Sequence, residues 1–242
     1  MAYKEAVFLF IFSFLLISCS KSHQQIASIK EETITNIDLN TEDNIKIKGT
    51  FFKGNKGMPS LILLHMLDRN RKDWNEFALS LQMIGFNVIS IDFRGHGESG
   101  LSWKKFSDGD FNNMISDVKV ANDYLIKQGL NNNVAIIGAS IGANIALNYA
   151  ANYSKVKTII LLSPGLDFRG VKTKDSIKQF KNPVLIVAAE DDSYSADSSK
   201  TLNSSSKNST LKIYNGSEHG TQLLMKTDVD KLIADWLKEN LK

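Results

Sequence analysis

The chain has 242 residues, 43% of them hydrophobic and 23% charged, which suits one globular domain with a sizeable core and a short extra segment. Its 29 basic and 26 acidic residues give a net charge of +3 and are spread along the chain, which argues against a nucleic-acid partner. The single cysteine excludes an internal disulfide, and the sequence shows no metal-ligand spacing and no phosphate-binding glycine loop.

The first segment is a short apolar stretch that follows Lys4 and covers residues 6–17. It is shorter than the roughly 20 residues that a membrane-spanning helix needs, and it has the length of a signal-peptide core. The stretch ends in Leu16-Ile17-Ser18-Cys19, which resembles the bacterial lipoprotein signal. That resemblance implies cleavage before Cys19 and a diacylglyceryl group on its thiol. The alternative is an uncleaved membrane anchor with an incidental cysteine.

The sequence therefore predicts three parts: a lipoprotein signal peptide over residues 1–18, a polar tether over residues 19–30, and a folded domain over residues 31–242. The expected location is the bacterial cell envelope, where the protein is attached to a membrane through the lipid on Cys19.

From residue 31 onward, short apolar runs alternate with stretches of helical periodicity. Predicted strands cover residues 33–39, 44–52, 60–65, 87–93, 134–137, 156–162, 183–189 and 210–214. Predicted helices cover residues 73–85, 111–128, 141–153 and 174–180, and a last helix contains the apolar stripe from Val229 to Leu237. We also expect a surface helix and a loop within the serine-rich residues 193–210.

Buried strands separated by helices predict an α/β fold with a mostly parallel central sheet and helices on both faces. The first two strands read as an antiparallel pair. Ligands of such sheets bind beyond the carboxyl ends of the strands. Asp92 lies at the end of a predicted strand, and Ser140, Asp192 and His219 follow predicted strand ends, so these residues are expected at one edge of the sheet.

Ser140 lies in Gly138-Ala139-Ser140-Ile141-Gly142, between a predicted strand and a predicted helix. Small residues two before and two after the serine allow a tight, strained turn that exposes its hydroxyl. A second motif, Asp92-Phe93-Arg94-Gly95-His96-Gly97-Glu98-Ser99, follows the buried apolar run at residues 87–91. An earlier predicted strand ends in His65.

Together these motifs resemble, in chain order, the α/β-hydrolase family, and the resemblance covers about residues 33–240. It implies the α/β-hydrolase fold. The sequence departs from the family at Met66, where the family has glycine, and only about 20 residues lie between Ser163 and Pro183 for a cap. A minimal cap, or none, is therefore expected.

The family order of serine, acid and histidine implies a triad. Its nucleophile would be Ser140, and its base His219, the only histidine after that serine. Ala189-Glu190-Asp191-Asp192 matches the frame in which the family places the acid, which favours Asp192. Asp191 and Asp167 remain alternatives.

The resemblance also assigns two oxyanion-hole donors, the backbone N–H groups of Ile141 and Leu67. Met66 raises the question of whether its backbone can replace that of glycine, and its side chain and that of Leu67 would narrow the pocket. His65, Asp92, Arg94 and His96 are expected to be structural, with the turn around residues 92–99 supporting the nucleophile loop.

The resulting hypothesis is a carboxylesterase-like serine hydrolase that acts on small or medium esters or acyl compounds through an acyl-enzyme, without a cofactor or metal. A peptidase, amidase or acyltransferase on the same triad is the alternative within the enzymes. A catalytically silent binding lipoprotein is the alternative of a different class.

Overall fold

The structure is a computed structural model that describes residues 33–130, 133–226 and 228–241. The described residues from Asn36 onward belong to one compact unit. The predicted signal peptide, the lipidation at Cys19 and the tether all lie outside the described residues. Within the described ranges, no helix is both long enough and apolar enough to cross a membrane.

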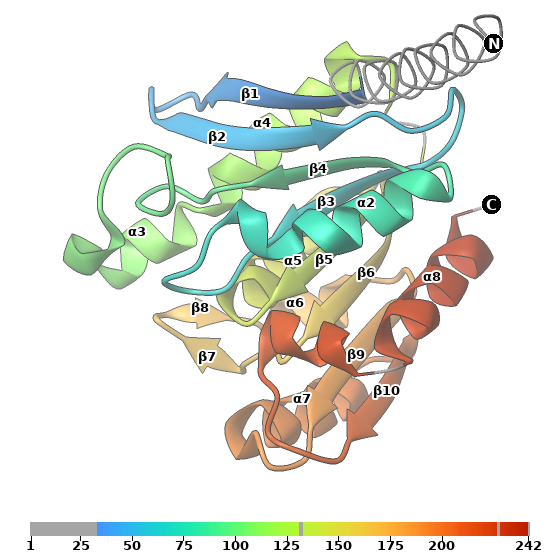
Figure 1. Cartoon of the computed structure of the whole chain (residues 1–242). Helices are drawn as coiled ribbons and strands as arrows, with labels where there is room; N and C mark the ends of the chain where they lie inside the picture. Colours follow the sequence, from blue (N-terminus) through green and yellow to red (C-terminus); the bar gives the residue numbers. More distant parts are fainter. Residues whose placement is uncertain (1–32, 131–132, 227, 242) are drawn as a thin grey trace, which may run out of the picture. The chain divides into compact units, whose positions relative to one another are not determined.

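Eight of the described strands form one sheet in the order β1-β2-β4-β3-β5-β6-β9-β10 (Figure 1). Strand β2 is antiparallel to β4, and every neighbouring pair from β4 to β10 in this order is parallel. The strands are β1 (Ile34–Asn40), β2 (Lys46–Phe52), β3 (Ser60–Leu64), β4 (Asn87–Ile91), β5 (Val134–Ala139), β6 (Val156–Leu162), β9 (Val184–Ala189) and β10 (Ser209–Tyr214).

Helices cover both faces of this sheet: Figure 1 shows α2 and α8 in front of it and α4 and α5 behind it. Strands β3, β4, β5 and β9 are buried along their whole length, as expected for parallel strands covered on both sides. The helices are α2 (Asn75–Met83), α3 (Asp108–Asn112), α4 (Ile115–Lys127), α5 (Ile141–Asn152), α6 (Lys174–Gln179), α7 (Ser193–Ser205) and α8 (Val229–Asn240), with 3₁₀ turns η1 (Arg71–Trp74), η2 (Trp103–Lys105) and η3 (Gly220–Met225). The predicted α/β architecture is confirmed.

The prediction of one helix over residues 111–128 was wrong, because two helices, α3 and α4, cover this segment with a break between them. Ser107 begins α3 with a capping box, in which its side chain accepts from Asp110 N–H and the Asp110 carboxylate accepts from Ser107 N–H. At the break, the N–H groups of Met114 and Asp117 donate to carbonyls three residues earlier, which is 3₁₀ bonding. The helical periodicity of the apolar residues therefore continues across two helices.

The segment between β6 and β9 is short and carries no inserted domain. It holds α6 and a small hairpin that the sequence analysis missed, formed by β7 (Asp167–Phe168) and β8 (Val171–Lys172). Its two turn residues, Arg169 and Gly170, have φ angles of 53° and 73°. Two positive φ values are typical of a tight hairpin turn, but arginine is an unusual residue for the first of these positions.

Candidate active site

Ser140 occupies a strained turn between β5 and α5. Its φ and ψ are 54° and −120°, and its N–H donates to the Leu162 carbonyl at 2.8 Å. A Cβ on Gly142 would lie 2.5 Å from the Leu64 carbonyl oxygen, and a Cβ on Gly138 would overlap the backbone of Gly142. Both flanking glycines are therefore required by close backbone approach, as the motif predicts.

His219 and Asp192 form a hydrogen-bonded pair at the carboxyl ends of β10 and β9. The Nδ1–H of His219 donates to Oδ2 of Asp192 at 2.7 Å. Because Nδ1 carries the proton, Nε2 of the neutral ring has the free lone pair, and it faces away from the carboxylate. The side chains are 40% exposed for His219 and 17% exposed for Asp192, so the imidazole is accessible to a ligand.

Gly220, which follows His219, anchors this loop beside the serine turn. Its N–H donates to Oγ of the buried Ser163 at 2.9 Å. A Cβ on Gly220 would lie 3.3 Å from the Cβ of Ala139, the residue before Ser140, and would overlap the Met66 sulfur. The end of β5, the His219 loop and the loop after β3 therefore meet at one place. Ser163 was missed by the sequence analysis because nothing local distinguishes it from other serines.

The other two candidate acids lie elsewhere. Asp191 is exposed, and its N–H donates to the Gly216 carbonyl, which ties the loop after β9 to the one after β10. Asp167 is exposed in the hairpin, where its backbone N–H and carbonyl both bond to the Tyr194 hydroxyl. Among the three carboxylates, only that of Asp192 has a recorded hydrogen bond to His219 in the described structure.

The loop after β3 is oriented by the buried ring of His65. Its Nδ1–H donates to the Met66 carbonyl at 2.6 Å, and its Nε2 accepts from the Phe93 N–H at 3.0 Å. A carbonyl only accepts and an amide N–H only donates, so these partners set the neutral tautomer. Burial lowers the pKa of His65 to about 3 and keeps the ring uncharged at neutral pH.

This contact also sets the direction of the Leu67 N–H. The Met66 carbonyl and the Leu67 N–H belong to one peptide plane, and in a trans peptide they point in opposite directions. The described chain has no cis peptide bond. Fixing the carbonyl on the His65 ring therefore aims the Leu67 N–H away from that ring. Met66 has no positive φ, so its backbone is not one that needs glycine; in this loop the positive φ, 57°, belongs to Asp68.

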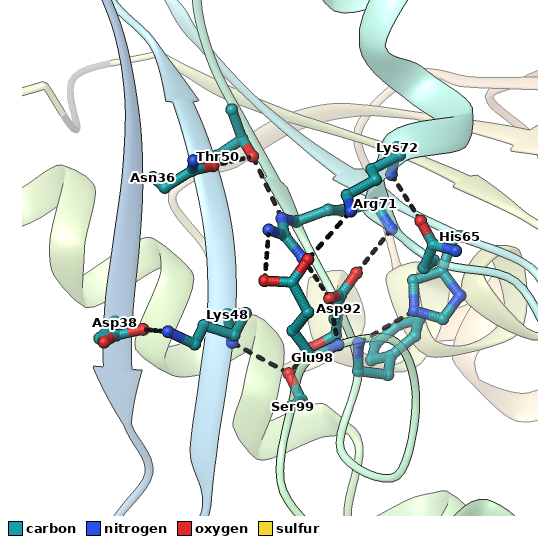
Figure 2. Close-up of polar contacts among 12 residues, drawn as sticks. Asn36, Asp38, Lys48, Thr50, His65, Arg71, Lys72, Asp92, Glu98 and Ser99 are labelled. Carbon is teal, nitrogen blue, oxygen red and sulfur yellow. Dashed lines mark hydrogen bonds and ion pairs between the residues drawn. The ribbon is translucent and has the colours of Figure 1, made fainter.

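Behind this loop, Arg71 joins η1 to the turn after β4 (Figure 2). The buried Asp92 carboxylate accepts from the Arg71 guanidinium, from the Arg71 N–H at 2.7 Å and from the Glu98 N–H at 2.8 Å. The guanidinium also donates to Thr50 at 3.1 Å and pairs with Glu98 at 3.3 Å. A buried carboxylate with this many donors is well satisfied and holds two loops in fixed relation.

The turn at residues 92–99 is connected by its contacts with Arg71 and His65 to the loop after β3, and its expected support of the nucleophile loop stays a prediction. Arg94 pairs instead with the buried Asp117, at 2.9 Å, and with Asp43. His96 stacks on Trp103, and burial lowers its pKa. The described residues contain no group of three or more His, Cys, Asp or Glu able to hold a metal ion.

A family model described as serine aminopeptidase, S33, matches residues 59–172, a span that contains Ser140 but ends before Asp192 and His219. No curated protein sequence matches the chain significantly.

Solved structures similar to the chain include three esterases. One from Pyrococcus furiosus has 19% identity and a TM-score of 0.73, over 86% of this chain and 91% of that one. One from a Rhodococcus species has 16% identity and a TM-score of 0.73, over 85% and 99%. One from Exiguobacterium antarcticum has 16% identity and a TM-score of 0.70, over 84% and 100%. These likenesses show that the chain has the α/β-hydrolase fold, and the family match indicates that it is a hydrolase.

Proposed function

We propose that the protein is a serine hydrolase that cleaves carboxylic esters of small or medium size. The observation that carries this proposal is the hydrogen bond from His219 to Asp192, on the sheet edge where Ser140 occupies its strained turn. A serine hydroxyl is a weak nucleophile unless a base takes its proton, and the base needs an acid that sets its tautomer. Ser140, His219 and Asp192 are the residues of this chain that supply these three functions.

In the proposed reaction, Ser140 Oγ attacks the acyl carbonyl while its proton moves to Nε2 of His219. The Asp192 carboxylate stabilises the resulting imidazolium. His219 then protonates the leaving alkoxide, which departs as the alcohol and leaves an ester on Ser140. Water, deprotonated by His219, attacks this acyl-enzyme and releases the acid and the free serine.

The negative charge on the tetrahedral oxygen would be stabilised by the N–H groups of Ile141 and Leu67. Ile141 is the first residue of α5, so no carbonyl of the helix accepts its N–H. The direction of the Leu67 N–H is set through the carbonyl of the same peptide, which accepts from the His65 ring at 2.6 Å and from the Arg69 N–H at 3.3 Å. Two donors fixed in this way need no rearrangement when the charge develops, and this is the source of their effect on rate.

The test is covalent labelling by a fluorophosphonate probe, which reacts with activated serines, together with hydrolysis of a short-chain aryl ester. Ser140→Ala should abolish labelling and lower turnover by several orders of magnitude, because triad members act as a unit. Ser154→Ala is the matched control: this serine is exposed, at the opposite edge of the sheet, and its loss should change neither signal. Wild-type turnover in Ser140→Ala would rule out the serine mechanism, and an unlabelled but folded wild type would favour a silent binding protein.

Amide hydrolysis is the second candidate, since the matched family model is described as serine aminopeptidase. The same triad can release the alcohol of an ester or the amine of an amide, so the preference between esters and amides depends on the substrate pocket. A panel of esters with matched amino-acid amides, assayed at equal concentration, decides between them. If the specificity constants are larger for the amides than for the matched esters, amide hydrolysis replaces ester hydrolysis as the proposed function.

Attachment of the protein to a membrane through a lipid on Cys19 is also proposed, on the Leu16–Cys19 motif alone. Metabolic labelling with a radioactive fatty acid should mark the wild type and leave Cys19→Ala unmarked and either unprocessed or released. Label retained in the variant would show that another residue is the acceptor.

A further inference from the structure

Lysines predominate at the edge of the sheet opposite the candidate site, where the exposed Glu239, in the last turn of α8, is the one acid among the described residues near Leu241 and Asn133. Residues 53–59, 153–155, 180–183 and 206–208 connect to β3, β6, β9 and β10 at the amino-terminal ends of these strands. Their charged residues are Lys53, Lys56, Lys155, Lys181 and Lys207, which we call the lysine edge. All five are exposed, and none forms an ion pair within the part of the chain that the structure describes.

Helix C-termini lie at this edge, and their dipoles favour positive charge there. Lys155, Lys181 and Lys207 follow the last residues of α5, α6 and α7 by two or three positions, where a positive charge is favourable. Lys53 and Lys56 follow strand β2, and their segment lies beside the end of α2: the Gln82 side chain donates to the Lys53 carbonyl at 2.9 Å, and the Asn55 N–H donates to the Gly85 carbonyl at 2.9 Å. In contrast, the connections at the candidate-site edge contain both signs of charge, including Asp68, Glu98 and Asp192 among the acids.

The lysine edge includes a hollow of about 320 Å³ between α6 and the connection that follows α7. Lys178, Lys181 and Lys207 line it together with Ser205 and Ser206. The ammonium groups, of which that of Lys178 lies 4.0 Å from Asp175, and the Ser206 hydroxyl are donors suited to the oxygens of a phosphate group, whereas the Ser205 hydroxyl already donates to the Thr201 carbonyl. The hollow therefore offers a place for an anionic headgroup within the lysine edge.

The described chain enters the fold at this same edge. Thr50 donates to the Asn36 side chain and Lys48 pairs with Asp38, so β1 and β2 are antiparallel. The end of β2 pairs with the start of β4, with Phe52 opposite Val88. Strand β1 consequently begins beside the amino-terminal ends of the parallel strands; in Figure 1, the β1 and β4 arrows point the same way.

We propose that the lysine edge docks on the anionic headgroups of the membrane that holds the lipid on Cys19. This inference rests on the proposed attachment, whose tether would leave the fold at the docking edge. Each lysine close to an anionic bilayer raises the membrane-binding constant about fivefold, and this effect weakens as salt screens the charges. Docking would direct Ser140 and His219 away from the bilayer, so substrate would reach them from the aqueous side.

The test uses the full lipidated chain in vesicles of phosphatidylcholine alone or mixed with phosphatidylglycerol. Acetylation of each lysine by an amine-reactive reagent is followed by peptide mass spectrometry. On anionic vesicles, the five lysines should react at least about threefold more slowly than on neutral ones, and high salt should restore their rates. The exposed Lys104 and Lys105, near the candidate site, are internal controls that should react equally on both.

A charge-matched pair of variants sharpens the result. The triple variant Lys155→Gln, Lys181→Gln and Lys207→Gln should release Lys53 and Lys56 from protection. Gln at the exposed Lys104, Lys105 and Lys172 removes the same charge and should leave that protection in place. Thermal melts check that both variants fold.

Three outcomes would overturn docking on lipid. They are equal reactivity of the lysine edge on both vesicles, protection of Lys104 and Lys105 instead, and equal protection by duplex DNA in solution, which would assign the edge to another polyanion. Fatty-acid label on Cys19 and ester hydrolysis are measured on the same samples. Failure of the docking proposal is thereby distinguished from failure of the proposed attachment or of the proposed reaction.

Discussion

Replacing His65 by phenylalanine tests whether a buried ring positions the oxyanion donor. Phenylalanine keeps an aromatic ring of similar shape but lacks the Nδ1–H that donates to the Met66 carbonyl and the Nε2 that accepts from Phe93. The Met66 carbonyl would then keep only its hydrogen bond from the Arg69 N–H, at 3.3 Å, and the Met66–Leu67 peptide would be held less firmly. Both former partners would remain buried with one hydrogen bond fewer.

Two effects follow, of different size. Each buried group left without its partner costs about 1–3 kcal/mol, so the free energy of unfolding should fall by about 2–6 kcal/mol. Deleting one oxyanion donor typically lowers kcat by about 10²–10³, and misaiming the donor costs part of this, so kcat should fall about 10- to 100-fold. KM should change much less, because the oxyanion forms only in the transition state.

The assay is steady-state hydrolysis of a short-chain aryl ester, with His96→Phe as the matched control. His96 is also buried and also bonds to a backbone carbonyl, that of Arg94, but it has no recorded hydrogen bond to the loop after β3. That variant should lose stability and keep its kcat. Equal kcat values in the two variants would refute the positioning argument, whatever their stabilities.

The same His65 variant should alter the pH dependence of stability. The folded pKa of about 3 lies below the ordinary value of 6.5, so the unfolded chain binds the proton first as pH falls. The stability from the neutral ring is complete above about pH 6.5 and is lost at up to about 1.4 kcal/mol per pH unit below it. The gap in stability between wild type and His65→Phe should therefore narrow by about 2 kcal/mol at about pH 5. A gap independent of pH in urea titrations would mean that folding does not change the pKa of this ring, which would contradict its burial in the neutral form.

Three further predictions concern the acid, the turn and the substrate. Asp192→Asn should fold normally and lose about 10⁴ in kcat, whereas Asp191→Asn should lose far less; the reverse order would reassign the acid. Gly142→Ala should prevent folding or lower the melting temperature sharply, since its Cβ would lie 2.5 Å from the Leu64 carbonyl oxygen; an unchanged melting curve would contradict this packing. Specificity constants for aryl esters should rise over the first acyl carbons and then level off, because the segment after β6 carries no lid; a steady rise to palmitoyl, or activation above the micellar limit, would indicate a long apolar cleft.

The sheet and the Ser140 turn were predictable because their signals are local. Buried parallel strands read as continuous apolar runs, and a serine between two glycines after such a run specifies one sharp turn. The helix break at Met114 was not predictable, since apolar periodicity passes through it unchanged. The hairpin was missed because Arg169 is an unusual residue at a left-handed position.

In the candidate site, the local signals indicated which loops carry functional residues but not how these loops are held. The His65 ring reaches the Phe93 backbone 28 positions away, and Arg71 reaches Asp92 across 21. A single sequence contains no signal for such pairings. The concern about Met66 was resolved only by its φ, since the neighbouring Asp68 takes the left-handed conformation instead.

The contact between Met66 and Gly220 makes two positions, 154 residues apart, share a single volume. Methionine fills the space that a side chain on Gly220 would occupy, so glycine at position 66 would vacate that space. A side chain at position 220, best asparagine because φ there is 57°, is expected to lower stability beside Met66, whose side chain would have to move, and to lower it less with glycine at position 66. Substitutions at the two positions should therefore be compensatory. In evolution, the change of Met66 to a smaller residue, which leaves a cavity, would have to come before the gain of a side chain at position 220.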